Sequence, residues 1–168
     1  MAAGATYEPI ATTTLGSASA TITFSSIPAT YTDLRLVIIP LANSSPDDFY
    51  LRFNSDSATN YSITTLYGSG SAAASNRATN ATGILMTRGT QTQLSTPTLR
   101  TADIFSYAGS TYKTVLTTES SDLNGSGTTV VNVGLWRSTS AITTITLNRV
   151  GDSFAAGTTA TIYGIKAA

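Results

Sequence analysis

The sequence contains neither cysteine nor histidine. Without thiols and imidazoles, the chain cannot form disulfides, use thiol catalysis, build a Cys/His zinc site or employ histidine as a general acid or base. Its stability must therefore come from side-chain packing, strand pairing and oligomerisation. We expect no cofactor and no dedicated metal site.

Charged side chains are also scarce. They make up 11% of the residues, with nine basic groups balancing nine acidic ones, against about 25% in a typical globular domain. A nucleic-acid partner would need clustered basic side chains, yet Lys113 and Lys166 are the only lysines. We therefore expect no nucleic-acid partner. Solubility must come from hydroxyl groups, since roughly a third of the residues are Ser or Thr.

Long hydrophobic runs are absent too. No stretch of the sequence approaches the ~20 apolar residues that span a bilayer, so we expect no membrane segment. The first residues, Met1 to Glu8, lack the basic and apolar regions of a secretory signal. A length of 168 residues suits one domain. We predict an N-terminal arm over residues 1–9 and a single β-sandwich domain over residues 10–168.

Short runs rich in Thr, Val, Ile and Tyr, separated by Gly, Ser, Asn and Asp, predict strands joined by turns. The expected strands cover residues 7–15, 20–24, 32–39, 49–53, 61–67, 83–87, 98–107, 112–118 and 128–136, followed by a final pair within 141–165. About ten strands without a convincing helix predict an all-β fold. The expected architecture is an antiparallel β-sandwich, jelly-roll-like, with an Ig-like sandwich or a barrel as alternatives.

Several strands carry more detailed predictions. The alternation in residues 20–24 places Ala20, Ile22 and Phe24 inward. Residues 32–39 become continuously apolar before a proline, which is typical of a central strand covered on both faces.

The connections carry predictions as well. Asn124-Gly125 is a strong hairpin signal. The final pair reads as one antiparallel hairpin that closes the domain, with Gly151 and Gly157 shaping its turn. Residues 68–82 contain no aromatic and no large aliphatic side chain, so we expect an exposed loop there.

The sequence offers little catalytic chemistry. Paired carboxylates suffice for glycoside hydrolysis, but most of the acidic residues stand in predicted turns beside Ser, Asn or Gly, where they bond their own backbone. Asn54 to Asp56 and the doubled Asp47-Asp48 offer hard oxygen ligands without the spacing of a calcium loop. Trp136 ends an apolar strand and is expected in the core or a subunit interface. We predict that the protein is not an enzyme.

Four motifs in order resemble a group of tailed-bacteriophage virion proteins, associated with phages of cyanobacteria and other aquatic bacteria. The motifs are Thr6-Tyr-Glu-Pro-Ile-Ala-Thr-Thr-Thr-Leu-Gly16, Thr21-Ile-Thr-Phe-Ser-Ser-Ile-Pro-Ala-Thr-Tyr-Thr-Asp-Leu-Arg-Leu36, Leu51-Arg-Phe-Asn-Ser-Asp56 with Asn60-Tyr-Ser62, and Gly151-Asp-Ser-Phe-Ala-Ala-Gly157 with Ile162-Tyr-Gly-Ile165. The resemblance covers nearly the whole chain. It implies a jelly-roll-like domain on the surface of the particle, made in the host cytoplasm and commonly a homotrimer.

The resemblance leaves the partner open between the major capsid protein and a tail component. With no coiled-coil or collagen-like shaft in the chain, we favour a capsid decoration (cement) protein that stabilises the head lattice. A tail-fibre or head-fibre receptor-binding domain is the alternative; a cell-surface adhesion module and a polysaccharide-degrading enzyme are weaker ones. The residues expected at interfaces come from the N-terminal arm, the acidic loop and the segment 68–82: Tyr7, Glu8, Pro9, Asp47, Asp48, Asn76 and Arg77.

Overall fold

The computed structural model describes residues 6–44, 48–86, 96 and 98–166. In this part of the chain all the regular structure is β, which confirms the predicted class, with twelve strands where about ten were expected. The strands are β1 Tyr7–Thr14, β2 Thr21–Phe24, β3 Asp33–Ile39, β4 Phe49–Phe53, β5 Tyr61–Gly68, β6 Ala73–Ala81, β7 Ile84–Leu85, β8 Leu99–Ile104, β9 Lys113–Asp122, β10 Gly127–Trp136, β11 Ile145–Arg149 and β12 Thr159–Ile165.

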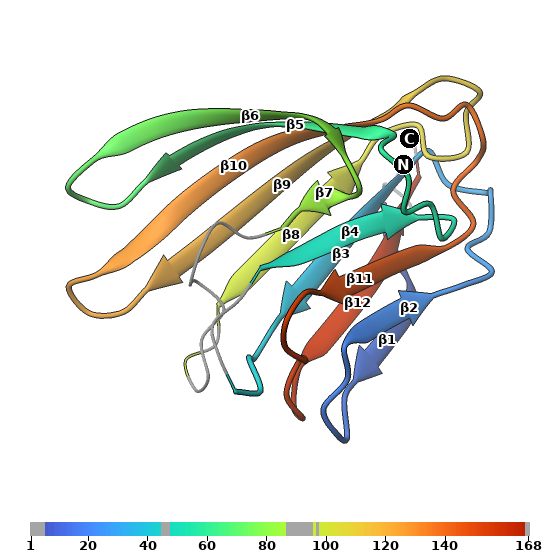
Figure 1. The fold of residues 1–168 in the computed structure, drawn as a ribbon. Helices are drawn as coiled ribbons and strands as arrows, with labels where there is room; N and C mark the ends of the chain where they lie inside the picture. Colours follow the sequence, from blue (N-terminus) through green and yellow to red (C-terminus); the bar gives the residue numbers. More distant parts are fainter. Residues whose placement is uncertain (1–5, 45–47, 87–95, 97, 167–168) are drawn as a thin grey trace, which may run out of the picture.

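The strands form two open antiparallel sheets of unequal size. The large sheet has eight strands in the order β1-β12-β3-β8-β9-β10-β5-β6, and the small sheet has four in the order β2-β11-β4-β7. Along the chain, β1 to β4 and then β11 and β12 alternate between the sheets, which gives the sandwich its jelly-roll-like character. In Figure 1 the small sheet covers one half of the large sheet, and β5, β6, β9 and β10 extend beyond it.

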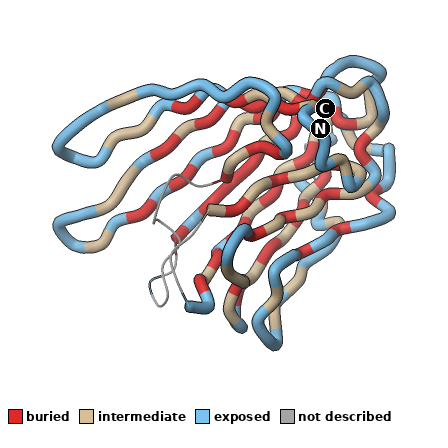
Figure 2. Tube along the Cα trace, viewed as in Figure 1, coloured by how far each residue is buried: buried red, intermediate tan, exposed pale blue. Residues whose placement is uncertain are grey.

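The core lies between the two sheets and follows the period of two expected for strands. On β3, Leu34, Leu36 and Ile38 are fully buried, and on β4 the same holds for Phe49 and Phe53. Figure 2 shows the buried residues concentrated in the overlapping half, while the far ends of β5, β6, β9 and β10 become exposed. Hydrophobic burial is therefore greatest where both layers are present.

The predicted β9–β10 hairpin is present. Its turn is closed by a bond from the Leu123 N–H to the Ser126 carbonyl oxygen, at 2.8 Å. Asn124 and Gly125 both have positive φ, 56° and 109°. Two successive positive φ angles are the requirement of a type I′ turn, whose twist matches that of the flanking strands.

The prediction of a closing C-terminal hairpin is wrong. The strands β11 and β12 are both present, but β11 pairs with β2 and β4 in the small sheet, whereas β12 pairs with β1 and β3 in the large one. The segment between them crosses from one sheet to the other. Gly151 and Gly157 take the expected positive φ angles, 87° and 86°. Between them, Phe154 is fully buried against the Phe49 ring, at a centroid distance of 5.2 Å, so a core contact helps to direct the crossing.

The prediction that residues 68–82 form a loop is also wrong. Residues 73–81 form β6, which pairs with β5 and ends the large sheet. The strand shows no alternation because neither of its faces is covered, and seven of its nine residues are exposed. Backbone pairing with β5 therefore holds β6 in place without a hydrophobic pattern.

Two smaller predictions need correction. On the strand over residues 20–24, Ile22 and Phe24 point inward as expected, but Ala20 lies before β2 and is exposed. The β3 strand is covered on one face only, since Arg35 and Val37 on its other face are half-buried and Ile39 is 41% exposed. That other face points away from the small sheet.

Candidate functional surfaces

Five of the seven residues predicted at interfaces lie at two opposite edges of the large sheet. Tyr7, Glu8 and Pro9 belong to β1 at one edge, so the chain joins the sheet two residues before the predicted end of the arm. Asn76 and Arg77 belong to β6 at the other edge. The structure does not bring these two groups together into one site. Asp47 lies outside the described residues, and Asp48 is half-buried just before β4.

At the β1 edge, Glu8 joins a cluster that fixes the strand to the domain. The Lys166 Nζ donates to Glu8 Oε1 at 2.6 Å, and the Tyr31 hydroxyl donates to Glu8 Oε2 at 3.2 Å. The hydrogen bond from Lys166 is the main cause that lowers the pKa of Glu8, and the same bond raises the pKa of Lys166. Desolvation, followed by the bond to Glu8, raises the pKa of Tyr31. These contacts occupy Glu8, so its role here is structural.

The outer face of the large sheet, turned away from the small sheet, carries a cluster of aliphatic side chains. We call it the aliphatic patch. It consists of Leu66, Leu116, Val131, Val133 and Leu135, on β5, β9 and β10. Val131 pairs directly with Leu66, and Val133 pairs with Leu116. Leu66 is 60% exposed and Val133 is 49% exposed.

Polar groups border the aliphatic patch on both sides. On the side toward β3, Asp103 is the register partner of Leu116 and forms an ion pair with Arg35 at 3.5 Å. On the side toward β6, Thr64 separates Val133 from Arg77 in the same row across the sheet. An apolar centre within a polar rim is the common anatomy of a protein–protein interface.

The sequence carried a signal for this patch. In β10, apolar residues occur on both faces of the strand. Val131, Val133 and Leu135 lie on the outer face, and the buried Val130 and Trp136 lie on the inner face. A strand covered on one face only should be polar at every second position. The surplus of apolar residues therefore marked β10 as a strand with two apolar faces.

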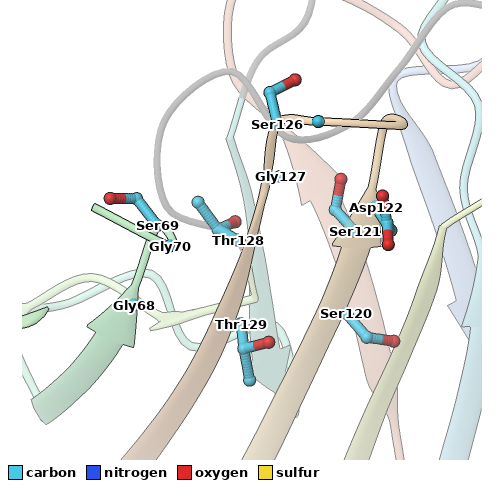
Figure 3. A pocket seen from close by; sticks show the side chains of 11 residues that line it. Gly68, Ser69, Gly70, Ser120, Ser121, Asp122, Ser126, Gly127, Thr128 and Thr129 are labelled. Atoms are coloured by element: carbon cyan, nitrogen blue, oxygen red, sulfur yellow. The ribbon is translucent and has the colours of Figure 1, made fainter. Parts of the chain in front are cut away.

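A shallow groove lies where the β5–β6 and β9–β10 turns approach each other. Its volume is about 510 Å³. It is lined by small and hydroxyl-bearing residues: Gly68, Ser69, Gly70, Ser120, Ser121, Asp122, Gly125, Ser126, Gly127, Thr128 and Thr129. In Figure 3, Thr128 lies between Ser69 of one hairpin and Ser121 of the other. Such a surface can exchange hydrogen bonds with a hydroxylated ligand, but no aromatic ring lines it for sugar stacking.

An ion pair that the sequence did not reveal lies on the inner face of the large sheet. Arg100 of β8 and Glu119 of β9 are register partners, with Arg100 Nη2 3.2 Å from Glu119 Oε1. Burial is the main effect on Arg100 and lowers its pKa, while the charge of Glu119 opposes that change. Both side chains are 0% exposed, so neither reaches a substrate. The pair is a structural element of the sheet.

The Asn54 and Asp56 oxygen atoms considered as calcium ligands are engaged with protein donors. Asp56 accepts hydrogen bonds from Trp136 Nε1 at 2.7 Å, from Asn60 Nδ2 at 2.9 Å and from the Ala58 N–H at 2.9 Å. Desolvation raises the pKa of Asp56, but these hydrogen bonds outweigh it and the net shift is downward. Asn54 Oδ1 accepts from the N–H groups of Thr143 and Thr144. Among the described residues, no three acidic side chains gather as metal ligands.

Trp136 belongs to the core of this chain. It is 2% exposed and its ring lies 5.4 Å from that of Phe53 and 6.3 Å from that of Tyr61, measured between centroids. Of the two places predicted for it, the core is therefore confirmed.

Comparisons with known proteins add a distant structural likeness. No protein-family model and no curated protein matches the chain. Among solved structures, the galectin LEC-6 of Caenorhabditis elegans matches with a TM-score of 0.37 and 10% sequence identity, over 93% of this chain and 96% of the galectin chain. Within the described residues, no helix has the length and hydropathy needed to cross a membrane.

Proposed function

We propose that this protein is a non-enzymatic structural component of a phage particle, a capsid decoration protein that binds the major capsid protein and stabilises the head lattice. The proposal joins the four-motif resemblance to one structural observation, the aliphatic patch. Leu66 and Val133 expose apolar surface beside three further aliphatic side chains. Covering such a surface with another protein removes apolar area from water and stabilises the complex.

The chemistry of the described residues also suits a binding protein better than an enzyme. Several carboxylates serve the fold: Asp56 accepts hydrogen bonds from three donors, and Asp152 pairs with Arg149 at 3.3 Å. Glu119 is fully buried. General acid–base catalysis needs a group within hydrogen-bond reach of the substrate. The accessible features are the aliphatic patch and a shallow groove, which suit binding.

The proposal is tested by binding to phage heads assembled without this protein. Leu66→Asp and Val133→Asp each place a charge in the aliphatic patch. As a control, Thr23→Asp adds the same charge at an exposed position of β2 in the small sheet. We expect the patch variants to bind heads at least about tenfold more weakly, since burying one such side chain contributes about 1.5–3 kcal/mol. The control should bind like the unmodified protein.

Circular dichroism and urea unfolding establish that each variant is folded before its binding is compared. Unchanged binding of both folded patch variants would contradict the role of the patch. Failure of the unmodified protein to bind heads at all would contradict the proposed function. Electron microscopy with the protein labelled distinguishes heads from tails, and label confined to tails would point to the alternative.

The alternative is a receptor-binding domain on a tail or head fibre. The groove between the β5–β6 and β9–β10 turns favours it, because its hydroxyl-rich lining can exchange hydrogen bonds with host glycans. Binding of the purified protein to a glycan array, abolished by Ser69→Leu, would support this function. Ser69 lines the groove and its side chain is exposed.

A further inference from the structure

The β6 strand presents an open edge of the large sheet to solvent. It is the last strand in the sheet order, and among the described residues only β5 pairs with it. Figure 1 shows β6 forming the outermost rim of the sheet. We propose that two copies of this protein associate through β6, in an antiparallel arrangement that joins their large sheets into one continuous sheet. This inference concerns self-association, gives a dimer where the resemblance implies a homotrimer, and does not depend on the proposed role in the particle.

The hydrogen bonds at the β5–β6 turn identify which β6 residues face the open edge. The Ser69 N–H donates to the Ala72 carbonyl oxygen at 3.0 Å, which makes residues 69 and 72 a hydrogen-bonded pair. Such pairs alternate along an antiparallel ladder, so residues 74, 76 and 78 direct their backbone groups toward β5. The N–H and C=O groups of Ala73, Ser75 and Arg77 therefore point to the open edge.

The bulge in β6 limits the usable length of this edge. Pairing with β5 is regular from Ala73 to Ala78 and then shifts before Ala81. Asn80, inside this irregular stretch, has a φ of 56°. A bulge twists an edge away from a partner. A second strand can therefore pair only with the regular stretch from Ala73 to Ala78.

The side chains on the regular stretch favour a second copy as the partner. A two-fold axis normal to the sheet must centre on one residue that faces its own copy. With the axis at Ser75, Ser75 faces Ser75 and Arg77 faces Ala73 of the other copy, so the only charged residue of β6 faces a small neutral one. With the axis at Arg77, two like charges would face each other, which is destabilising. The Ser75 register provides about six backbone hydrogen bonds.

The opposite edge of the sheet is unsuited to the same contact. The β1 strand contains Pro9, which has no N–H to donate, and its pairing with β12 shifts between Pro9 and Ala11. Glu8 is also held by Lys166. Because the open edge of β1 cannot form a regular ladder of hydrogen bonds, a head-to-tail fibre that pairs β1 of one copy with β6 of the next is disfavoured. Pairing of β6 with β6 closes after two copies.

A disulfide test locates the contact, because the natural chain has no cysteine of its own. In the proposed pair, the two Ser75 Cα atoms lie about 5.5 Å apart, within the range that a disulfide spans. We expect Ser75→Cys to form a covalent dimer rapidly under mild oxidation. The matched control is Ser71→Cys in the β5–β6 turn, where the two Cα atoms would lie about 27 Å apart. Equal crosslinking of the two variants would overturn the proposal.

The mass in solution provides the second test. Sedimentation equilibrium of the unmodified protein at high micromolar concentration should give twice the monomer mass of 17.4 kDa. Ser75→Lys places two like charges in the self-facing pair and should shift the protein to monomer, whereas Ser71→Lys should remain dimeric. A monomer or trimer of the unmodified protein, or a dimer that Ser75→Lys leaves intact, would overturn the proposal. Binding to phage heads is measured separately, so failure of either proposal is recognised independently.

Discussion

At the scale of single residues, the Arg100–Glu119 ion pair places two opposite charges inside the protein. Both side chains are fully buried, and the Nε of Arg100 has no hydrogen-bond partner. Removing one member of a buried pair leaves the other charge uncompensated. We expect Glu119→Ala to lower the free energy of unfolding by about 3–5 kcal/mol, measured by urea denaturation.

The double variant Arg100→Met/Glu119→Leu is the control for this prediction. It removes both charges and fills the space with apolar side chains, so it should be more stable than Glu119→Ala. A double variant that is less stable than the single one would show that the pair itself, and not the lone buried charge, determines the loss.

A close contact at Gly164 gives a second prediction at this scale. A Cβ added to Gly164 would lie 2.3 Å from Cγ of the Tyr31 ring. The ring is itself held by Glu8, so it has little freedom to move. We expect Gly164→Ala to lower the free energy of unfolding by about 1–3 kcal/mol.

Gly68→Ala on β5 is the matched control, because no atom lies within 4 Å of its added Cβ. Its unfolding free energy should stay within about 0.5 kcal/mol of the unmodified protein, as for most surface changes. Equal losses for the two variants would contradict the contact argument.

At the scale of elements, the Tyr61 hydroxyl links β4 to β5. It accepts a hydrogen bond from the Phe53 N–H and donates to the Asp56 carbonyl oxygen, both at 3.1 Å. Desolvation raises the pKa of Tyr61 to about 12 from a usual value of 10.0. Above pH 10 the unfolded chain therefore releases this proton before the folded one does. Its contribution to stability is complete below pH 10 and is lost as the pH rises toward about 12.

Urea denaturation across this alkaline range tests the effect. The unmodified protein should lose stability more steeply with pH than Tyr61→Phe, which lacks the titrating hydroxyl. Lys113 acts in the opposite direction, since desolvation lowers its pKa, but it is present in both proteins and cancels in the comparison. Parallel pH profiles would contradict the assignment to Tyr61.

Local sequence pattern predicted most individual strands but not their partners. Residues 49–53 alternate strictly because one face is buried, and β4 has the predicted bounds. The strand β6 escaped prediction because neither face is covered and its position depends on β5. The β11–β12 connection looked like a hairpin because apolar runs and glycines do not encode which sheet a strand joins. Contacts between distant residues, such as Phe49 and Phe154, decide that.

The candidate surfaces were predictable to a similar extent. Arg77 and Asn76 were assigned to an exposed segment, and both are exposed, although on a strand. Predicting the aliphatic patch required knowing which face each residue of β5, β9 and β10 occupies, because its five members come from three separate strands. The groove depends on two turns that meet only in the folded chain.

At the scale of the whole molecule, low charge should make particle binding insensitive to salt. The net charge is zero and only 11% of the residues are charged, and screening weakens only interactions between accessible charges. Binding through the aliphatic patch should therefore change less than about twofold between low and high sodium chloride, measured by cosedimentation with heads. A loss of binding at high salt would indicate that ionic contacts dominate instead.

The unequal size of the two sheets also determines which parts of the protein open first. Near β3, both layers are present and Leu34, Leu36 and Ile38 are fully buried, so the amides there should exchange with deuterium only through global unfolding. The β6 strand is held by β5 alone and has little buried surface. Its separation from β5 costs far less free energy than global unfolding, so β6 amides should exchange fastest among the paired strands. Association through β6 would slow the exchange of these amides, so local opening of this edge and assembly of two molecules are coupled.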